Sequence, residues 1–250
     1  MSAAPLSLDS TIRLRRGNEI PIFGLGTWLS EAGGECKEAV STALDYGYRL
    51  IDTATMYKNH KDVGEALRAK GKRESTYLVS KLSNDAHGYD EALAELDMTL
   101  EELGVESLDL WLMHSPSAGK VVETWKAMLA ARDSGKVKAV GVSNFGVKQL
   151  EALKAAGFEQ PEVNQFELHC WNQQRELCAH CIAEGIAVMS FCPLARCKLF
   201  GQTALTQIAT ATGLSEAALA IRWLLQKQYV TSAPTLSVEH IEHVLVPGCS

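Results

Sequence analysis

The chain has 250 residues, of which 46% are hydrophobic and 22% are charged. This composition is that of an ordinary globular protein, and it excludes a disordered, collagen-like or coiled-coil chain. The formal net charge of −6 disfavours sequence-independent binding of nucleic acid, which requires concentrated positive charge. We therefore expect small-molecule partners and no nucleic acid.

The sequence predicts neither a membrane segment nor a secretory leader. Its most apolar run, Ile186 to Ala195, falls well short of the roughly 18 residues that a membrane helix needs. The opening stretch MSAAPLSLDS lacks the basic and apolar parts of a signal peptide, and the 7 cysteines are an odd number. We interpret the thiols as reduced, and we expect a cytoplasmic monomer.

Short apolar runs rich in β-forming residues alternate with longer amphipathic stretches along the chain. A hairpin with Gly17 and Asn18 at its turn is predicted first, over residues 11–22. Eight strands are then predicted at Phe23–Trp28, Arg49–Ala54, Tyr77–Leu82, Leu108–His114, Val137–Ser143, Glu162–Leu168, Ile186–Phe191 and Tyr229–Ala233. Helices are predicted at Glu35–Tyr46, Asp62–Lys70, Tyr89–Leu103, Val121–Ser134, Val147–Ala156, Gln173–Glu184, Ser215–Gln228 and Ser237–Leu245.

This alternation predicts an α/β fold in which crossover helices join parallel strands. Eight strand–helix units in about 250 residues are typical of a closed (β/α)8 TIM barrel, with the N-terminal hairpin closing its bottom. An open doubly wound sheet is the alternative, but Gly24 and Gly26 supply only the first two glycines of its nucleotide-binding turn. No linker divides the chain, so we predict a single domain over residues 1–250.

Polar residues interrupt three predicted strands near their carboxyl ends, where a barrel carries its active site. Asp52, Lys81 and His114 occupy such positions, and Tyr57 follows Asp52 in the next loop. A buried lysine requires a partner, and Asp52 is the natural one. We expect Lys81 to lower the pKa of the Tyr57 phenol, so that the phenol serves as an acid near neutral pH. His114 is expected to donate a hydrogen bond to a carbonyl substrate or to share its proton with the phenol.

Around these residues the sequence resembles the aldo-keto reductase family. The likeness runs from about Ile12 to Ile241, and the order and spacing of its motifs are highly specific. The matching segments are Leu50–Tyr57, Val63–Leu67, Ser80–Leu82, Leu112–His114, Gly141–Phe145 and Val163–Gln165, with Glu167 beyond the last.

The resemblance implies a nicotinamide-dependent reductase of small aldehydes or ketones. It assigns the catalytic tetrad to Asp52, Tyr57, Lys81 and His114, with Tyr57 as the proton donor, and the cofactor supplies the hydride. Ser143, Asn144 and Gln165 would hold the carboxamide, and Phe191 replaces a ring-stacking tyrosine. The remaining implied cofactor contacts are Thr27, Trp28, Pro193, Leu194, Arg196, Lys198, Thr235 and His240.

The phosphate end of the cofactor site departs from the family pattern. Where relatives often carry Lys-Ser and then Arg, this chain has Pro234, Thr235 and His240, which removes permanent positive charge. Arg196 and Lys198 are the alternative sources of charge for a phosphate. We favour NADP(H), with NAD(H) as the alternative.

The substrate pocket is also expected to differ from the family pattern. Ser83 and Ser115 stand where relatives commonly have tryptophan, and Trp28 is the aromatic wall that remains. The chain ends at Ser250, so we expect it to lack a long C-terminal substrate loop. A wider and more polar pocket predicts broad specificity with modest affinity.

One motif also resembles a metal site, and two other functions are alternatives to a reductase. Cys178, His180 and Cys181, with His169 and Cys170 upstream, resemble metal ligands, but helical spacing favours core packing, and we predict no metal. The alternative function is a regulatory or structural barrel that binds cofactor but turns over little. A Schiff-base enzyme that uses Lys81 is disfavoured, because a lysine paired with a carboxylate stays protonated.

Overall fold

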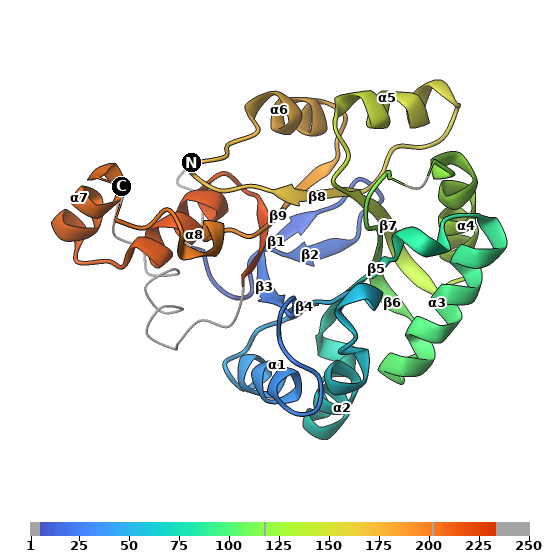
Figure 1. The fold of residues 1–250 in the computed structure, drawn as a ribbon, viewed down its shortest axis with the longest axis horizontal. Coiled ribbons are helices and arrows are strands. Elements are labelled where there is room, and N and C mark those ends of the chain that lie inside the picture. The colour runs from blue at the N-terminus through green and yellow to red at the C-terminus, as the bar shows by residue number, and fades with distance from the viewer. Residues whose placement is uncertain (1–5, 118, 202, 234–250) are drawn as a thin grey trace.

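The computed structural model describes residues 6–117, 119–201 and 203–233. Eight parallel strands close into a barrel in the order β10-β3-β4-β5-β6-β7-β8-β9, and β9 pairs with β10 to complete the ring. Helices surround the strands (Figure 1), which confirms the predicted (β/α)8 TIM barrel. The strands are β3 (Phe23–Gly26), β4 (Leu50–Asp52), β5 (Tyr77–Leu82), β6 (Leu108–Met113), β7 (Val137–Ser143), β8 (Val163–Glu167), β9 (Ala187–Phe191) and β10 (Val230–Ala233).

Seven helices lie close to their predicted positions. They are α1 (Glu35–Asp45), α2 (His60–Lys70), α3 (Tyr89–Leu103), α4 (Val121–Asp133), α5 (Val147–Ala155), α6 (Arg175–Ala183) and α8 (Glu216–Gln226). Gly71 and Gly104 take the left-handed C-cap positions of α2 and α3, as expected of glycines that end helices. The helix predicted at Ser237–Leu245 lies outside the described residues.

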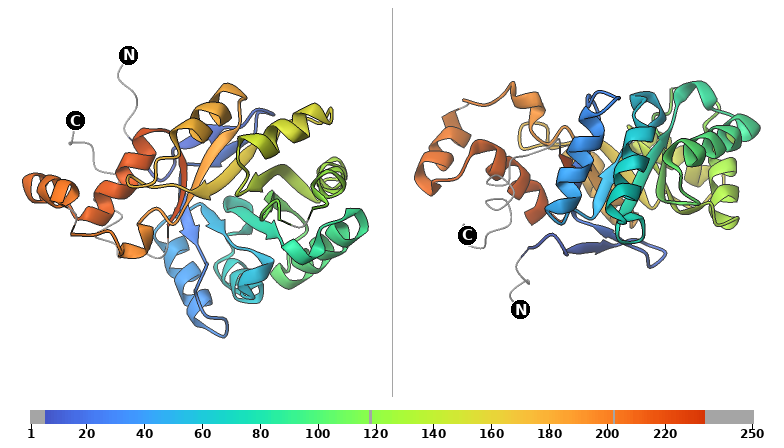
Figure 2. Two further views of the ribbon diagram at one scale, coloured as in Figure 1. Left: turned by 45° about the horizontal axis from the view of Figure 1, so that its top comes forward. Right: turned by 90° about the horizontal axis from the view of Figure 1, so that it is seen from below.

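Helix α7 (Thr203–Thr212) was not predicted. Its sequence TALTQIATAT holds four threonines, and β-branched residues lower helix propensity. The helix packs against α8 and projects from the side of the barrel (Figures 1 and 2). In the described part of the chain no single helix is long and apolar enough to cross a bilayer; α7 and α8 reach that length and composition only together, bent by 97°.

The N-terminal hairpin lies across one end of the barrel (Figure 2). Strands β1 (Thr11–Arg13) and β2 (Glu19–Pro21) pair antiparallel, and the Leu14 amide donates to the Asn18 carbonyl at 2.7 Å across the turn. Leu14 and Ile20 pack against inward-facing barrel residues such as Leu50. The hairpin therefore closes the bottom of the barrel, as predicted, and leaves the carboxyl ends of the strands open.

Alternation along the strands decides which side chains enter the barrel. Leu50, Val79 and Leu112 belong to the small interior cluster, whereas their sequence neighbours pack under the helices. Two residues beyond these three come Asp52, Lys81 and His114. The same period therefore points all three polar side chains inward, one layer nearer to the open end.

Gly24 serves barrel packing rather than nucleotide binding. It lies in β3, and a Cβ atom at this position would collide with Leu50 of the neighbouring strand. Strand β3 ends at Gly26, two residues earlier than predicted, and Leu29 then turns the chain with a φ of 68°. Trp28 consequently lies in a loop at the open end.

Candidate active site

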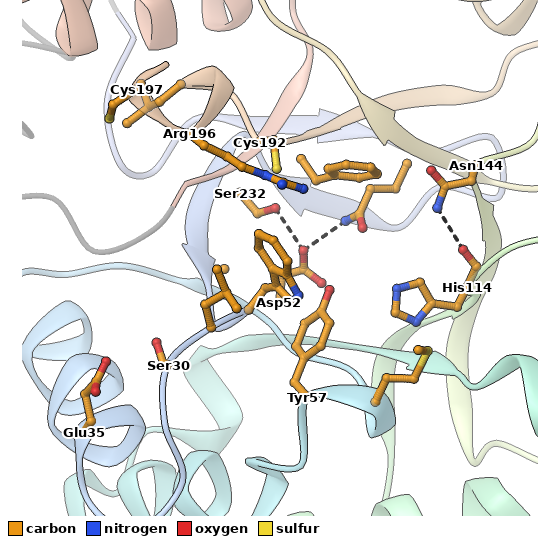
Figure 3. Close-up of a pocket in the computed structure, with 17 residues that line it drawn as sticks. Ser30, Glu35, Asp52, Tyr57, His114, Asn144, Cys192, Arg196, Cys197 and Ser232 are labelled. Atoms are coloured by element: carbon orange, nitrogen blue, oxygen red, sulfur yellow. Dashed lines mark hydrogen bonds between the residues drawn. The ribbon is translucent and has the colours of Figure 1, made fainter. Parts of the chain in front are cut away.

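A cavity of about 700 Å³ opens at the carboxyl ends of the strands. Its size is that of a small-molecule site, and its position is the one that barrel enzymes use. Figure 3 shows Asp52, Tyr57 and His114 facing this cavity from different strands and loops. The lining residues are Gly26, Trp28, Leu29, Ser30, Glu35, Asp52, Met56, Tyr57, His114, Asn144, Gln165, Phe191, Cys192, Leu194, Arg196, Cys197 and Ser232.

A buried lysine lies at the centre of the site. The Lys81 Nζ atom donates to Asp52 Oδ1 at 2.6 Å, to the Thr53 carbonyl at 3.0 Å and to the Tyr57 hydroxyl at 3.1 Å. The side chains of Lys81 and Asp52 are only 1% and 4% exposed. A buried ion pair is tolerated when further hydrogen bonds satisfy both charges, and three acceptors use the donors of this ammonium. The predicted pairing of Lys81 with Asp52 is therefore present.

The second carboxylate oxygen of Asp52 is also fully engaged. Gln165 Nε2 and the Ser232 hydroxyl each donate to Asp52 Oδ2 at 2.9 Å. We call Asp52, Tyr57, Lys81, Gln165 and Ser232 the floor of the cavity. Ser232 was not predicted, although its place two residues after the inward-facing Val230 of β10 is a signal that could have found it.

Tyr57 reaches the floor from a short 3-10 turn, η1 (Thr55–Tyr57), that follows β4. The Thr55 hydroxyl donates to the carbonyl oxygen of Lys81 at 3.2 Å, so the turn is tied to the strand that carries the lysine. The Tyr57 ring packs edge-on against the His114 ring, with 5.9 Å between centroids. Backbone and side-chain contacts together fix the separation of the phenol, ammonium and imidazole.

Lys81 lowers the pKa of Tyr57, as predicted, but the predicted net direction of the shift is wrong. Burial raises the pKa of the phenol above its ordinary value, and the neighbouring Lys81 ammonium offsets this only in part. The prediction from the sequence included the effect of Lys81 on the phenol pKa but not the opposite effect of burial. The phenol consequently stays protonated across the neutral range, which is the state that a proton donor needs.

The other two titratable groups also have definite charge states. Burial lowers the pKa of Lys81, but Asp52 and Tyr57 raise it more, and the net pKa lies above the ordinary value. Burial and the nearby ammonium lower the pKa of His114 to about 4. Its Nδ1 atom is buried and has no partner among the described residues. At neutral pH the site therefore holds a charged lysine and a neutral histidine.

Asn59 is a positioning residue that the sequence did not reveal. It is 1% exposed, donates through Nδ2 to the carbonyl oxygens of Thr27 at 2.9 Å and Ser30 at 3.1 Å, and accepts from the Thr53 hydroxyl at 3.0 Å. These bonds join the loop that carries Trp28 to the strand end that carries Asp52. Its place two residues after Tyr57, before a helix, was the available signal.

Three of the predicted cofactor contacts lie together on one wall. Asn144, Gln165 and Phe191 come from the ends of β7, β8 and β9, and all three line the cavity. Asn144 has a φ of 61°, and its Nδ2 donates to the His114 carbonyl at 3.0 Å and the Ser143 hydroxyl at 3.1 Å. With Gln165 Nε2 committed to Asp52, the carbonyl oxygens of both amides remain for a ligand that donates hydrogen bonds.

The outer part of the cavity is built from two loops, and we call Trp28, Leu29, Cys192, Arg196 and Cys197 its mouth. The Arg196 guanidinium carbon lies 4.9 Å from the centroid of the Trp28 ring. Except for Trp28, all of these residues have left-handed backbone, with φ between 49° and 68°. Such conformations are uncommon for residues other than glycine and cluster at functional sites.

Several predicted site residues lie away from the cavity surface. Thr27 and Ser143 are buried behind it, Pro193 is buried, and Lys198 is exposed outside it. The Ser83 amide and hydroxyl both bond to the Glu95 carboxylate, and the Ser115 hydroxyl bonds to Asn84 Oδ1 at 2.8 Å. Neither serine lines the cavity. Thr235 and His240 lie outside the described residues.

The cysteines near the possible metal motif pack in the core. Cys178 and Cys181 of α6 are 3% and 0% exposed, and both belong to the main hydrophobic cluster. Burial raises the pKa of the Cys181 thiol to about 11, which disfavours the thiolate that binds metal. Among the described residues, no three histidine, cysteine or acidic side chains are grouped as metal ligands.

Comparison with known proteins identifies the family. The model of the Aldo/keto reductase family matches residues 23–245. A glyoxal reductase of Bacillus subtilis (strain 168) is 40% identical over 238 residues, which cover 95% of this chain and 86% of that protein. The crystal structure of an aldo/keto reductase from Brucella melitensis has a TM-score of 0.87 and 36% identity, and covers 94% of this chain and 91% of that one.

A Bombyx mori aldo-keto reductase solved in complex with NADP has a TM-score of 0.85 and 32% identity, and covers 94% of this chain and 86% of that one. The chain therefore belongs to the aldo/keto reductase family. It is an NAD(P)H-dependent oxidoreductase, as the sequence motifs predicted.

Proposed function

We propose that this protein reduces small aldehydes and ketones with NADP(H), and that Tyr57 donates the proton to the carbonyl oxygen. The observation that carries the proposal is the Tyr57 hydroxyl at the floor of the cavity, 3.1 Å from the Lys81 ammonium and packed against His114. A cofactor bound against the same floor supplies the hydride.

The wall opposite Tyr57 suits a nicotinamide ring. Phe191 offers an aromatic face for stacking, and losing the tyrosine hydroxyl of the family pattern leaves that face intact. The carbonyl oxygens of Asn144 and Gln165 accept no hydrogen bond from the described residues, and they suit the amide donors of a carboxamide. Ser143 supports this arrangement from behind, because its hydroxyl accepts a hydrogen bond from Asn144.

The charges at the floor favour proton donation by Tyr57. When the phenol releases its proton to the substrate, the phenolate gains the Lys81 ammonium as a partner already in place. Asp52 keeps that ammonium charged, and Gln165 and Ser232 keep Asp52 in position. Electrostatic partners that need no rearrangement are the most effective means of stabilising charge that develops in a reaction.

His114 is assigned to orienting the substrate. With a pKa of about 4 it is neutral at physiological pH, so it donates a hydrogen bond from one ring nitrogen without adding a second positive charge beside Lys81. A neutral donor next to the phenol helps to hold a carbonyl oxygen within reach of the Tyr57 proton. Trp28 and Met56 supply the apolar walls around the rest of a small substrate.

The preference for NADP(H) is supported by the relative solved with NADP. The segment after β9 holds Pro193 and Leu194, whose backbone would meet the cofactor, and Lys198, whose exposed ammonium would meet a phosphate. Thr235 and His240 remain predicted contacts outside the described residues. The monomeric state and the cytoplasmic location likewise stay predictions from the sequence.

The test is oxidation of NADPH and of NADH by the purified chain across a panel of aldehydes, ketones and quinones, with identification of the alcohol product. We expect aldehyde-dependent oxidation of NADPH and, in fluorescence titrations, tighter binding of NADPH than of NADH. Tight cofactor binding without turnover of any carbonyl compound would contradict the proposal and would favour a regulatory barrel.

A further inference from the structure

The segment from Thr55 to His60 carries Tyr57 and is bound to strand β5 at both of its ends. Its first residue, Thr55, donates through its hydroxyl to the carbonyl oxygen of Lys81 at 3.2 Å. Its last residue, His60, has its Nε2 atom 3.0 Å from the hydroxyl oxygen of Ser80. Ser80 and Lys81 are consecutive residues of β5, so both contacts hold the segment against the strand that supplies the ammonium.

Helix α3 supports the same segment from a second side. Three of its polar side chains, at positions 95, 99 and 102, are spaced four and three residues apart and therefore share one face of the helix. The Thr99 hydroxyl lies 3.3 Å from that of Thr55, and Glu102 Oε2 lies 3.0 Å from His60 Nδ1. Glu95 accepts from the first backbone amide beyond β5 at 2.6 Å. Helix α3 thus contacts both ends of the segment and the end of the strand.

His60 is 1% exposed and uses both of its ring nitrogens. Burial lowers the pKa of its imidazole, and Glu102 offsets this only in part, so the ring is neutral at neutral pH. A carboxylate only accepts hydrogen bonds, and Nδ1 therefore carries the ring proton and donates to Glu102. Nε2 is then the acceptor, and the Ser80 hydroxyl donates to it. The three side chains form one series of hydrogen bonds that runs from the strand to the surface.

The order of these three groups is that of a serine hydrolase triad, but their place in the fold excludes a nucleophile. Ser80 is 0% exposed and does not line the cavity. Its side chain points toward the helices, because Lys81 beside it points into the barrel and neighbours on a strand alternate. A substrate has no access to this hydroxyl. What the series of bonds acts on is therefore the segment that carries Tyr57.

The contacts close a ring around the phenol and the ammonium. Tyr57 and His60 lie three positions apart in one segment, and His60 bonds to Ser80 across to the strand. The next residue of the strand, Lys81, returns to the Tyr57 hydroxyl at 3.1 Å. Within the ring Lys58 has left-handed backbone, with a φ of 58°, and such a conformation persists where surrounding contacts determine it. Apolar packing would hold the helices as firmly, but a hydrogen bond also fixes direction and length.

We propose that His60 is a positioning residue for proton donation by Tyr57. Its bond to Ser80 sets the separation of the phenol and the Lys81 ammonium. A longer separation slows donation, because the forming phenolate then loses part of the stabilisation that the ammonium provides. This inference rests on the proposed function, in which Tyr57 is the proton donor. Glu102 acts one step further away, since it holds the imidazole in the tautomer that accepts from the serine.

Two amide substitutions at His60 provide the test, because each keeps one of its two hydrogen bonds. The carboxamide of glutamine reaches about as far as Nε2 and keeps the bond to Ser80, whereas that of asparagine ends near Nδ1 and keeps only the bond to Glu102. The measurements are the single-turnover rate of NADPH oxidation at saturating benzaldehyde, the KM for benzaldehyde and the Kd for NADPH.

We expect His60→Asn to lower the single-turnover rate by about 10- to 100-fold, since a displacement of about 1 Å at the reacting groups can cost about 10²-fold. Its KM and Kd should stay near the wild-type values, because His60 does not line the cavity. His60→Gln should keep a rate close to that of the wild type. A loss of packing alone would not distinguish the two amides in this way.

Ser80→Ala breaks the same bond from the strand and removes only one oxygen atom. It should lower the rate as His60→Asn does, and the double variant should lose little more, because both substitutions remove one shared contact. His180→Asn is the matched control. His180 Nε2 lies 3.4 Å from Glu151 on helix α6, away from the cavity, so this variant should keep the wild-type rate.

A wild-type rate in His60→Asn would overturn the proposal. Equal losses in His60→Asn and His60→Gln would overturn it too, because the bond to Ser80 would then not be their cause. A change confined to KM or to the Kd for NADPH would assign His60 to binding instead of proton donation. If the wild type reduced no carbonyl compound, the proposed function would fail first and this inference with it.

Discussion

The floor and the mouth of the cavity are built in opposite ways. Floor residues Asp52, Lys81, Gln165 and Ser232 lie on barrel strands, are almost completely buried, and engage one another through bonds of 2.6–2.9 Å. The mouth lies on two loops, is partly or fully exposed, and uses left-handed backbone to place its side chains. The strands of the barrel thus hold the floor through buried mutual contacts, whereas the mouth depends on loop backbone, which generally tolerates substitution better than the strands of a core.

Two ion pairs of equal length provide the strongest test of whether burial distinguishes the floor from the surface. Lys81–Asp52 and Lys70–Asp45 both have an N–O distance of 2.6 Å, but the first is buried and the second lies on the surface. Asp52→Ala should lower the free energy of unfolding by about 3–5 kcal/mol, because it leaves an uncompensated buried ammonium. Asp45→Ala should cost less than about 1 kcal/mol. Urea unfolding checks both, and equal losses would contradict the account.

Asn59 joins the floor to the mouth, so its removal should cause the second largest loss of stability. Asn59→Ala removes two donated and two accepted hydrogen bonds in a fully buried place, and we expect a loss of about 2–3 kcal/mol in the free energy of unfolding. The same substitution at Asn172, whose side chain bonds to the Glu167 carbonyl at an exposed site, should cost less than about 1 kcal/mol. Unfolding curves in urea would show the difference. An Asn59→Ala variant as stable as the wild type would contradict the role of Asn59 in joining the floor to the mouth.

The neutral state of His114 predicts a dependence of stability on pH. Because the folded pKa of about 4 lies below the ordinary 6.5, the unfolded chain binds more protons between these values, and stability is lost as the pH falls through this window. His114 should account for about 2 kcal/mol of loss between pH 7 and pH 4.5. His60 and His87, whose pKa values burial also lowers, should add to the slope.

His114→Asn isolates the part of this slope that belongs to His114. Urea unfolding of the wild type and the variant at several pH values between 4.5 and 7 gives the two slopes. The variant should keep the contributions of His60 and His87 and lose that of His114. Parallel slopes in both proteins would contradict a neutral, buried His114.

The smallest effect is expected at the mouth. Leu29 is 72% exposed and has a φ of 68°, so Leu29→Gly removes little buried surface and relieves left-handed strain. The gain is offset by the greater flexibility of glycine in the unfolded chain, and the net change in unfolding free energy should stay within about 1 kcal/mol. Thermal or urea unfolding measures it; a loss above about 2 kcal/mol would show that the mouth is as tightly packed as the floor.

The floor of the cavity could largely be predicted from the sequence, whereas the mouth could not. The period of two along the strands and the spacing of the polar residues were enough to bring Asp52, Lys81 and His114 to one layer of a (β/α)8 barrel. The direction of the Tyr57 pKa could not be predicted, since it depends on how far burial outweighs the ammonium. Nor could the stacking of Arg196 on Trp28, because it joins loops whose backbone lies outside regular structure. Helix α7 was not predicted, because its four threonines lower the helix propensity of the segment.

The central claim is that the Tyr57 phenol, set against Lys81, is the proton donor. Tyr57→Phe keeps the ring and its packing on His114 while removing the hydroxyl, and Lys81 retains Asp52 and the Thr53 carbonyl as partners. We expect kcat/KM for aldehyde reduction to fall by about 10²–10⁴-fold while NADPH affinity stays within about threefold, and we expect Tyr46→Phe at the exposed end of α1 to change neither. Turnover by Tyr57→Phe within tenfold of the wild type would contradict it.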